Sequence, residues 1–465
     1  MTSPPSDVNN SATAPGASEA RVRGQGKLLS AGLIGSSIEW YDFFLYGTAA
    51  ALVFPEVFFP DSSATTGILL SFSTFWAGFV ARPIGGVIAG HLGDRHGRKK
   101  IVVASMVMMG LGTFLIGCLP GAGTIGVLAP TLLVMLRFVQ GLACGAQWGG
   151  VVLLLTESAS PKRKGFAGTF GQMGVSFGVF LGSTVFLAAS RLTSEQAFTD
   201  WGWRVPFLAS ALMFPVALYI QTKVEDTPEF RELAAEAAGK HRRIVKAPVK
   251  EAIKGHWRTI LLASGLLSGT NALFYVSIAG VVSYATTELD VSRDAVLSVS
   301  IPITLLGAVL VLGSGWISDR IGRRPLIILG AALIAVWAFP YFWLVDTGSI
   351  ALIAVAIGVG GIGQSLTYGP LAAYIGELLE PNVRLSGASL AYQLSSITVS
   401  GGTPFIMAAI LKETGSTFLV STFIAAMGLI TLVCAWVLRE TNPATVRNDP
   451  DALPGLNPSL PAQTS

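Results

Sequence analysis

Residues 90–100 read GHLGDRHGRKK, and residues 315–325 read GWISDRIGRRP. Asp, Arg, Gly and Arg recur in the same order, and the second copy follows the first after 225 residues. A second pair of sites has a similar offset of 220 residues: Glu157 and Glu377 each precede a proline by four positions. Two similar offsets indicate a duplicated chain whose halves have the same orientation.

The composition is that of a membrane protein. Hydrophobic residues make up 51% of the 465 residues and charged residues 12%, against about 25% charged in typical soluble domains. This excludes a soluble enzyme, a nucleic-acid binder and a disordered scaffold. The three cysteines have no metal-binding spacing, so we expect no metal site, no cofactor and no catalytic centre.

Twelve apolar runs are long enough to span a bilayer core of about 30 Å. They divide six and six around a polar stretch, and such parallel repeats are found in transporters. We therefore predict an all-α integral membrane protein with two six-helix halves. The runs are 28–53, 68–92, 101–119, 126–156, 165–189, 204–222, 259–286, 294–316, 325–345, 349–379, 384–411 and 416–438.

Lysine and arginine lie mainly on one side of this topology. Of the 31 basic residues, 25 fall in the tails and the loops on the same side, and four fall in the opposite loops. Because cytoplasmic loops carry the excess of basic residues, we expect both termini in the cytoplasm. The predicted segments are a disordered tail 1–27, a first half 28–222, a cytoplasmic linker 223–258, a second half 259–438 and a tail 439–465.

The repeated loops suggest a gating latch between the halves. Glycine at the turn permits a tight connection between helices, and the aspartate can accept backbone N–H groups and pair with arginine. Glu157 is a candidate partner for Arg98. The alternative is that the basic loops only set topology. The candidate latch residues are Asp94, Arg95, Gly97, Arg98 and Glu157 in the first half and Asp319, Arg320, Gly322, Arg323 and Glu377 in the second.

Four ionisable residues lie deep in the predicted spans, all of them in the first half: Glu39, Asp42, Arg82 and Arg137. Such a residue costs at least about 2.5–3.5 kcal/mol at mid-bilayer. One interpretation is a structural ion-pair network. The other is a proton site, with Asp42 first and Glu39 second, beside a site where Arg137 and Arg82 bind a substrate carboxylate. An acid that gains and loses an arginine partner would load and release a proton.

The second half carries only neutral polar groups at depth. Each alone is typical of helix packing, but together they could bind substrate hydroxyl groups. These candidates are Asn271, Tyr275, Gln364, Tyr368, Tyr392 and Gln393.

Several further strings make the chain resemble the major facilitator superfamily, and within it the metabolite:proton symporter family. They are IEWYDFFLYG at 38–47, ARPIGG at 81–86, GDRHGRK at 93–99, WGWRVPF at 201–207 and EDTPEF at 225–230. Within that family, the chain resembles carriers of shikimate, 2-oxoglutarate, citrate and proline/betaine. In one departure, Gln147 stands where many relatives have an acid, and we count it among the candidate substrate ligands.

The resemblance and the buried charges together imply a cytoplasmic-membrane carrier that imports a small organic acid with protons by alternating access. The expected partners are an organic anion, protons and the lipid bilayer, with no nucleic acid, and the expected state is a monomer. The alternatives are a proton-coupled exporter or a zwitterion carrier. A membrane sensor or enzyme fits less well, because no soluble signalling domain or nucleophile–base pair is present in the sequence.

Overall fold

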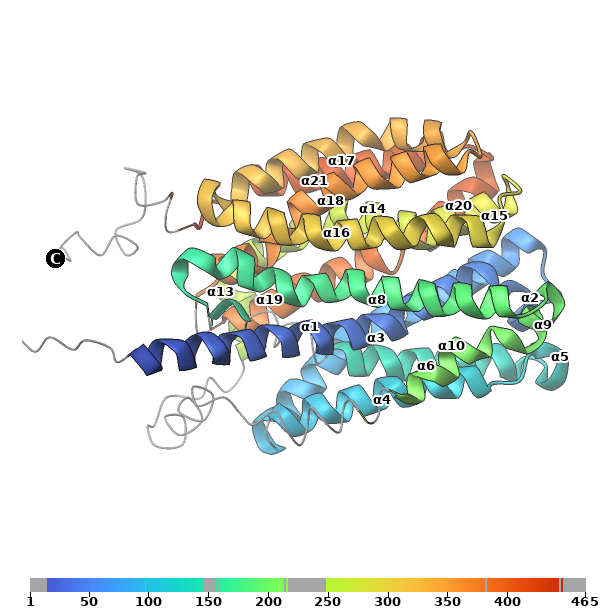
Figure 1. The fold of residues 1–465 in the computed structure, drawn as a ribbon, viewed down its shortest axis with the longest axis horizontal. Coiled ribbons are helices and arrows are strands. Elements are labelled where there is room, and N and C mark those ends of the chain that lie inside the picture. Colours follow the sequence, from blue (N-terminus) through green and yellow to red (C-terminus); the bar gives the residue numbers. More distant parts are fainter. Residues whose placement is uncertain are drawn as a thin grey trace, which may run out of the picture.

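A computed structural model describes residues 15–96, 98–145, 155–157, 159–212, 215, 248–380, 383–442 and 445. Within these ranges the chain is helical and has no strands, which confirms the all-α prediction. Helices suit a membrane because their backbone groups are all hydrogen-bonded internally. Figure 1 shows the long helices side by side, with α16, α17, α18 and α21 of the second half above the helices of the first half.

The first half contains the helices before residue 213. They are α1 (Pro15–Leu52), α2 (Phe54–Phe58), α3 (Ala64–His96), α4 (Arg98–Cys118), α5 (Ala122–Ile125), α6 (Leu128–Gly145), α8 (Lys164–Leu192), α9 (Glu195–Ala197) and α10 (Arg204–Leu208).

The second half contains the helices from residue 248 onward. Two of its spans are interrupted by π-helical segments, η4 and η5. The elements are α13 (Pro248–Leu266), α14 (Ser268–Tyr275), η4 (Val276–Gly280), α15 (Val281–Thr287), α16 (Arg293–Ile321), α17 (Arg323–Val345), α18 (Ile350–Leu378), α19 (Arg384–Ser395), η5 (Ser396–Ser400), α20 (Thr403–Thr414) and α21 (Phe418–Val437).

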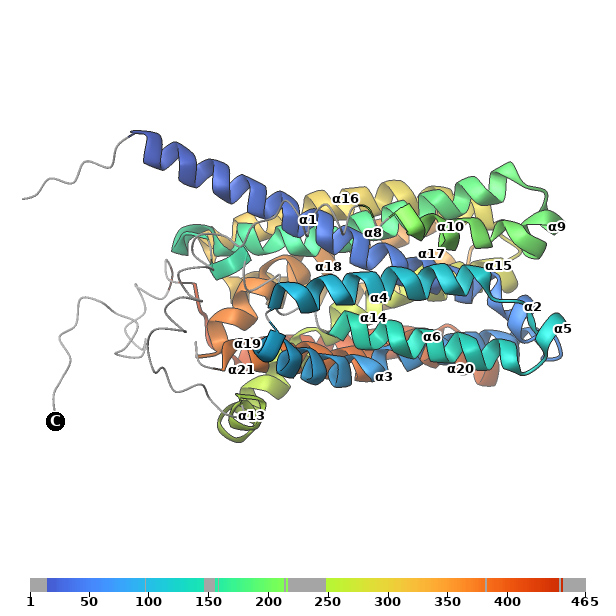
Figure 2. The same ribbon diagram turned by 90° about the horizontal axis from the view of Figure 1, so that it is seen from below.

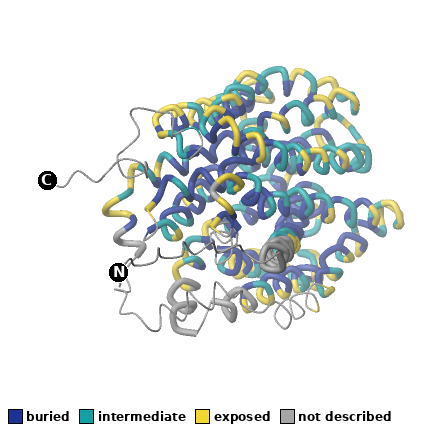
Figure 3. The backbone as a smooth tube through the Cα atoms, turned by 60° about the vertical axis from the view of Figure 1, so that its left-hand side comes forward, coloured by how far each residue is buried: buried dark blue, intermediate teal, exposed yellow. Residues whose placement is uncertain are grey.

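Nine stretches of helix in the described part of the chain are long and apolar enough to cross a membrane. They match nine of the twelve predicted runs. The first, third and sixth runs correspond to α1, α4 and α10 where the structure describes them. Figure 3 shows buried positions gathered in the interior of the bundle and exposed positions along its outer helices. Many exposed side chains are large and apolar, such as Val309, Val336 and Trp343, as a surface facing lipid requires.

Two predicted boundaries are wrong. The first helix begins at Pro15, inside the stretch 1–27 that we expected to be disordered; alanine, glutamate and arginine there favour helix, and proline suits a first helical turn. Helix α13 begins at Pro248, inside the predicted linker, and has a kink at His256. Figure 2 shows the start of α1 and the helix α13 at one end of the bundle, which we call the termini end. The helix expected at 229–240 lies outside the described residues.

Close packing of α1 on α8 fixes the helix that carries Glu39 and Asp42. A Cβ added to Gly178 would lie 2.6 Å from the Cβ of Trp40, so only glycine allows this approach. The Ser36 hydroxyl, one turn before Trp40 on α1, donates to the Gly171 carbonyl of α8 over 2.7 Å. The acids of α1 therefore have a defined position relative to the rest of the bundle.

Candidate functional site

Two buried arginines lie against one aromatic ring. The guanidinium carbon of Arg82 (α3) is 4.5 Å from the centre of the Phe43 ring, and that of Arg137 (α6) is 4.4 Å from it. Each arginine is 1% exposed. Among the described residues, neither the Nε nor the Nη2 atom of either arginine has a hydrogen-bond partner. These are donors of the kind that bind a carboxylate through two parallel hydrogen bonds.

The two arginines meet because α3 and α6 pack with their backbones in contact. A Cβ added to Gly145 would collide with the carbonyl group of Arg82, and one added to Gly141 would collide with that of Gly78. A Cβ added to Gly78 would lie 2.8 Å from the Nε of Arg137. Small residues at these positions let the helices approach closely, and this brings both guanidinium groups to Phe43.

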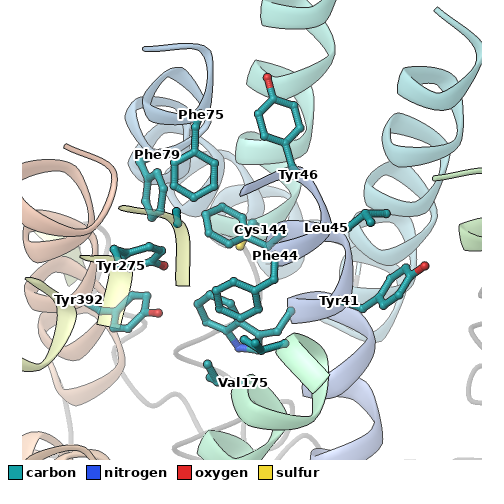
Figure 4. Packing of buried hydrophobic residues seen from close by; sticks show 14 of the residues in the cluster. Tyr41, Phe44, Leu45, Tyr46, Phe75, Phe79, Cys144, Val175, Tyr275 and Tyr392 are labelled. Carbon is teal, nitrogen blue, oxygen red and sulfur yellow. The ribbon is translucent and has the colours of Figure 1, made fainter. Parts of the chain in front are cut away.

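Arg82 faces the second half of the protein. Its guanidinium carbon is 4.5 Å from the centre of the Phe79 ring, and it interacts electrostatically with Tyr275 and Tyr392. The rings of Phe79 and Tyr275 are 5.7 Å apart. Figure 4 shows Tyr275 and Tyr392 next to each other, with Phe79 close to Tyr275. This arginine is therefore the buried cation at the interface between the halves.

Glu39 lies on the same side as Arg82. Its Oε1 atom accepts a hydrogen bond from the thiol of Cys144 over 3.3 Å, and its carboxyl group interacts electrostatically with Arg82. An acid and a base from different helices thus share the interface with the tyrosines of the second half.

Arg137 lies against aromatic rings of the first half, and it also interacts electrostatically with Tyr275 of the second half. Its guanidinium carbon is 4.2 Å from the centre of the Tyr46 ring and 5.0 Å from that of Phe75. Its Nη1 donates to the side-chain oxygen of Gln140 over 3.3 Å. The buried carboxyl group of Asp42 is an electrostatic neighbour of Arg137. The sequence suggested that Asp42 and Arg137 lie near each other, but it did not suggest the aromatic rings.

The polar candidates of the second half fall into two groups. Tyr368 interacts electrostatically with both Tyr275 and Tyr392, so these three tyrosines form one cluster facing Arg82. The Asn271 side chain donates to the Ser395 hydroxyl over 3.2 Å, a link between α14 and α19.

Two further glutamines were candidates in the second half and one in the first. Gln393 is buried, and its Oε1 atom has no hydrogen-bond partner among the described residues. Gln364 is half-buried, one turn before Tyr368 on α18. Gln147 lies outside the described residues.

The cavities around these residues are small. One between the halves, lined by Phe44, Phe75, Val179, Ile278 and Leu297 among others, has a volume of about 20 Å³, room for one water molecule. A second, lined by Phe43, both arginines, Gln140 and Cys144, has no space for a water molecule. Neither of these two cavities has room for an organic molecule beside Arg82.

The predicted latch of the second half joins the halves at the termini end. The carboxylate of Asp319 accepts the backbone N–H groups of Gly165 and Phe166, each over 2.8 Å, at the start of α8. A carboxylate at a helix N-terminus is favoured by the helix dipole. Arg323 forms two ion pairs: its Nη1 atom is 2.6 Å from Oδ1 of Asp319, and its Nε atom is 3.5 Å from Oε2 of Glu377.

The turn of this latch requires glycine. Gly322 has a φ of 110°, a conformation that side-chain-bearing residues rarely adopt. Arg320, which we also expected in the latch, is exposed, and its guanidinium carbon lies 3.4 Å from the centre of the Trp316 ring on the same helix.

The first-half latch can be described only in part. Glu157 forms an ion pair with Arg384 of the second half over 3.1 Å, a partner that we did not predict. Gly97 and the side chains of Asp94, Arg95 and Arg98 lie outside the described residues. At the opposite end of the bundle, Asp294 accepts a hydrogen bond from Ser190 and pairs with Arg191, so polar contacts between described residues join the halves at both ends.

The segment after the last helix completes the second-half latch. The Glu440 carboxylate accepts the backbone N–H groups of Arg323 and Arg324 over 3.0 and 2.9 Å. The Asn442 side chain donates to the carbonyl groups of Ser318 and Asp319. We call residues 439–442 the C-terminal clasp. These four residues open the predicted tail 439–465, and they satisfy backbone groups at two helix ends.

Several polar residues of the site were not predicted. Gln140 could have been found, because it lies three residues after Arg137 on the same helix face. Cys144 and Thr113 sit in apolar runs without a distinguishing pattern, and Glu440 lies in what reads as a polar tail.

Comparison with known proteins places the chain in a family. Residues 32–403 match the description Major Facilitator Superfamily. The chain is 37% identical to the inner membrane metabolite transport protein YhjE of Escherichia coli (strain K12), over 90% of this chain and 95% of that protein. It is 35% identical to the shikimate transporter of the same strain, over 88% and 93%.

A solved structure has the same fold. The xylose transporter XylE of Escherichia coli, in a partially occluded inward-open conformation, superimposes with a TM-score of 0.69 at 18% identity, covering 90% of this chain and 98% of that one. These are transporters and not enzymes. The sequence match, the helical fold and the apolar spans agree: the chain is a multi-pass membrane protein that belongs to the Major Facilitator Superfamily.

Proposed function

We propose that the protein is a secondary transporter that imports a small organic anion together with protons, acting as a monomer by alternating access. The observation that carries the proposal is Arg82. Its guanidinium is buried at the interface of the halves, and its Nε and Nη2 atoms have no hydrogen-bond partner among the described residues. An anion between the halves would satisfy both donors.

The aromatic rings support an anionic substrate over a cationic one. Aromatic cages can bind quaternary ammonium groups, but here the arginines already lie over the rings of Phe43 and Phe79. A ligand cation would meet two guanidinium groups at this place. We assign Tyr275, Tyr368 and Tyr392 of the second half to neutral contacts with the rest of the substrate.

We assign different roles to the two arginines. Arg82, at the interface, is the ligand of the substrate carboxylate. Arg137, inside the first half, is the partner of Asp42, and Asp42 carries the proton, with Glu39 as the second candidate. We change our sequence-based order, with Arg137 first for the substrate, because Arg82 interacts with both Tyr275 and Tyr392 of the second half, whereas Arg137 is placed beside Tyr275 and Asp42.

The contacts that join the halves at both ends support alternating access. Asp319 and Glu157 join the halves at the termini end, which we assign to the cytoplasm from the excess of basic residues there, and Asp294 joins them at the other. Breaking one set while keeping the other would open the site to one side only. We assign Asp94, Arg95, Gly97 and Arg98 to the same latch from their sequence match to the second-half loop.

The alternative is a zwitterion carrier. Glu39 and Arg82 are close enough to interact at the interface, so an ammonium group beside Glu39 and a carboxylate on Arg82 is a second arrangement that this site allows. Here the net charge of the substrate is zero, and the test below separates the two.

The test is uptake by purified protein in liposomes. Labelled mono- and dicarboxylates and labelled betaine are added to liposomes whose external pH is lower than the internal pH. Uptake is measured with and without a protonophore, in sodium-free and sodium-containing buffer, and liposomes without protein are the control. We expect carboxylate uptake that needs the pH gradient and stops with protonophore. Betaine uptake with no carboxylate uptake supports the zwitterion carrier. Uptake that follows sodium and ignores protonophore contradicts proton coupling.

A further inference from the structure

Two neutral side chains connect the proposed proton carrier to its arginine. Thr113 on α4 and Gln140 on α6 are buried, with exposed fractions of 0% and 2%. The Gln140 amide donates to the Thr113 hydroxyl over 2.6 Å, and its oxygen accepts from Arg137 over 3.3 Å. Thr113 also lies within hydrogen-bonding reach of the Asp42 carboxyl group. The four residues therefore form a continuous polar chain across three helices.

Thr113 has one proton and two acceptors for it. A threonine hydroxyl can donate one hydrogen bond and accept two, and it accepts one of these from Gln140. Its proton can go to the Met109 carbonyl, 3.1 Å away on the same helix, or to Asp42. An ionised Asp42 attracts this proton, because hydrogen bonds to charged groups are the stronger ones. A protonated Asp42 competes less well, and the hydroxyl turns to Met109.

Gln140 passes this change on to Arg137. The amide holds one nitrogen of the guanidinium, while Nε and Nη2 have no hydrogen-bond partner among the described residues. Its orientation is fixed by its two hydrogen bonds, one to each neighbour. When the Thr113 hydroxyl rotates, Gln140 stays bonded to the same oxygen but meets a differently oriented dipole, and polarisation along the chain carries this change to the hydrogen bond between Gln140 and Arg137.

We propose that Thr113 and Gln140 are positioning residues that link the protonation of Asp42 to the placement of Arg137. The inference rests on the proposed proton coupling. When Asp42 takes a proton on its carboxyl oxygen, Thr113 transfers its hydrogen bond to Met109, and Arg137 loses the charge that attracted it. When the proton leaves, both changes reverse.

The charged groups around Asp42 fit this arrangement. Arg137 on α6 is the cation that interacts with it directly. Arg82 on α3 acts on Arg137, and Tyr41 is a neighbour on its own helix. Thr113 is the contribution of α4. It carries no charge itself, so it can change its hydrogen bond without adding a second titrating group.

The test compares Thr113→Val with Thr113→Ser. Valine keeps the shape and removes the hydroxyl, and serine restores it. Thr403→Val is the matched control, because Thr403 is also fully buried and, among the described residues, its hydroxyl donates to the Val399 carbonyl one turn earlier, in η5. Each purified variant is assayed for substrate exchange at fixed pH and for uptake across a pH series, normalised to folded protein.

We expect Thr113→Val to retain exchange but to move the half-maximal pH of uptake upward by about one unit, since a hydrogen bond to an ionised group shifts a proton equilibrium by roughly tenfold. Accumulation at a fixed gradient should fall with it. Thr113→Ser and Thr403→Val should keep the wild-type pH profile.

Three other results overturn the inference. An unchanged pH profile in Thr113→Val, with the wild type proton-coupled, refutes the role of Thr113. Equal loss of exchange and uptake in Thr113→Val and Thr403→Val shows that any buried hydroxyl matters for folding only. A wild type without proton dependence instead contradicts the proposed function, and this outcome is recognised before any variant is examined.

Discussion

Replacement of Asp42 by asparagine separates a proton carrier from a structural ion pair. The substitution keeps the size of the side chain and removes the group that titrates. Asp42 is 2% exposed, and its Oδ1 atom has no hydrogen-bond partner among the described residues. Its loss therefore removes a poorly solvated charge as well as a partner for Arg137, and these two effects on the free energy of unfolding oppose each other.

The structure sets the expected size of each effect. Breaking a buried ion pair from one side typically costs about 3–5 kcal/mol. In the variant, Arg137 keeps its contacts with three aromatic rings and with Gln140. Removal of the buried negative charge of Asp42 also avoids its desolvation cost, and this offsets part of the loss of the ion pair. We expect a loss of about 1 kcal/mol or less in the free energy of unfolding, well below the ion-pair value.

The decisive assay measures accumulation and exchange on the same preparation. At a pH difference of one unit and no membrane potential, each coupled proton supports an accumulation of about tenfold. The wild type should reach this ratio, and Asp42→Asn should only equilibrate the substrate, while exchange between the two sides continues because it needs no net proton movement.

Two outcomes would refute this reasoning. Full accumulation by Asp42→Asn would exclude Asp42 and transfer the role to Glu39. A joint fall in folded protein, exchange and accumulation, with recovery of folding when Arg137→Gln is added, would identify the pair as structural.

The remaining predictions concern the other parts of the site. Arg82→Lys keeps the charge but loses the two parallel hydrogen bonds, a loss of roughly 3 kcal/mol in binding free energy, so the KM for the substrate should rise about a hundredfold. Arg258→Gln, at an exposed position, should leave the KM unchanged, and equal KM values for Arg82→Lys and the wild type would exclude Arg82 as the ligand. Asp319→Asn should lower the transport rate about tenfold, since charge-assisted bonds contribute roughly 1.5–3 kcal/mol, with little change in folded yield; a normal rate would leave the loop as a topology signal only. Glu440→Gln should lower the unfolding temperature of the purified protein more than the exposed Glu413→Gln does, and equal temperatures would contradict a stabilising clasp.

The repeated loops and the apolar runs were sufficient to predict the fold, because both depend on local sequence. Asp319 and Glu377 were recognisable for the same reason, since each recurs at the offset of its first-half counterpart. The contact of Glu157 with Arg384 was not, because it depends on how the two halves close on each other. No pattern within one half contains that information.

The surroundings of the buried charges were also beyond the sequence. Phe43, Phe75 and Phe79 lie in apolar runs where aromatic residues are expected as core, so nothing marked them as partners of arginine. The depth of each charge was readable from its place in a run. Which arginine faces the second half depends on the rotation of α3 and α6, and that is set by glycine contacts between the two helices.

The C-terminal clasp has a practical consequence for anyone who handles this protein. Glu440 and Asn442 bond to the ends of two helices, so the last transmembrane helix is not where the folded unit stops. A purification tag, a fluorescent reporter or a protease site placed immediately after Leu438 would replace the residues that hold the α16–α17 turn. Fusions should begin beyond residue 442. In a series of C-terminal truncations, the yield of folded protein should fall once the cut removes residues between Leu438 and Asn442.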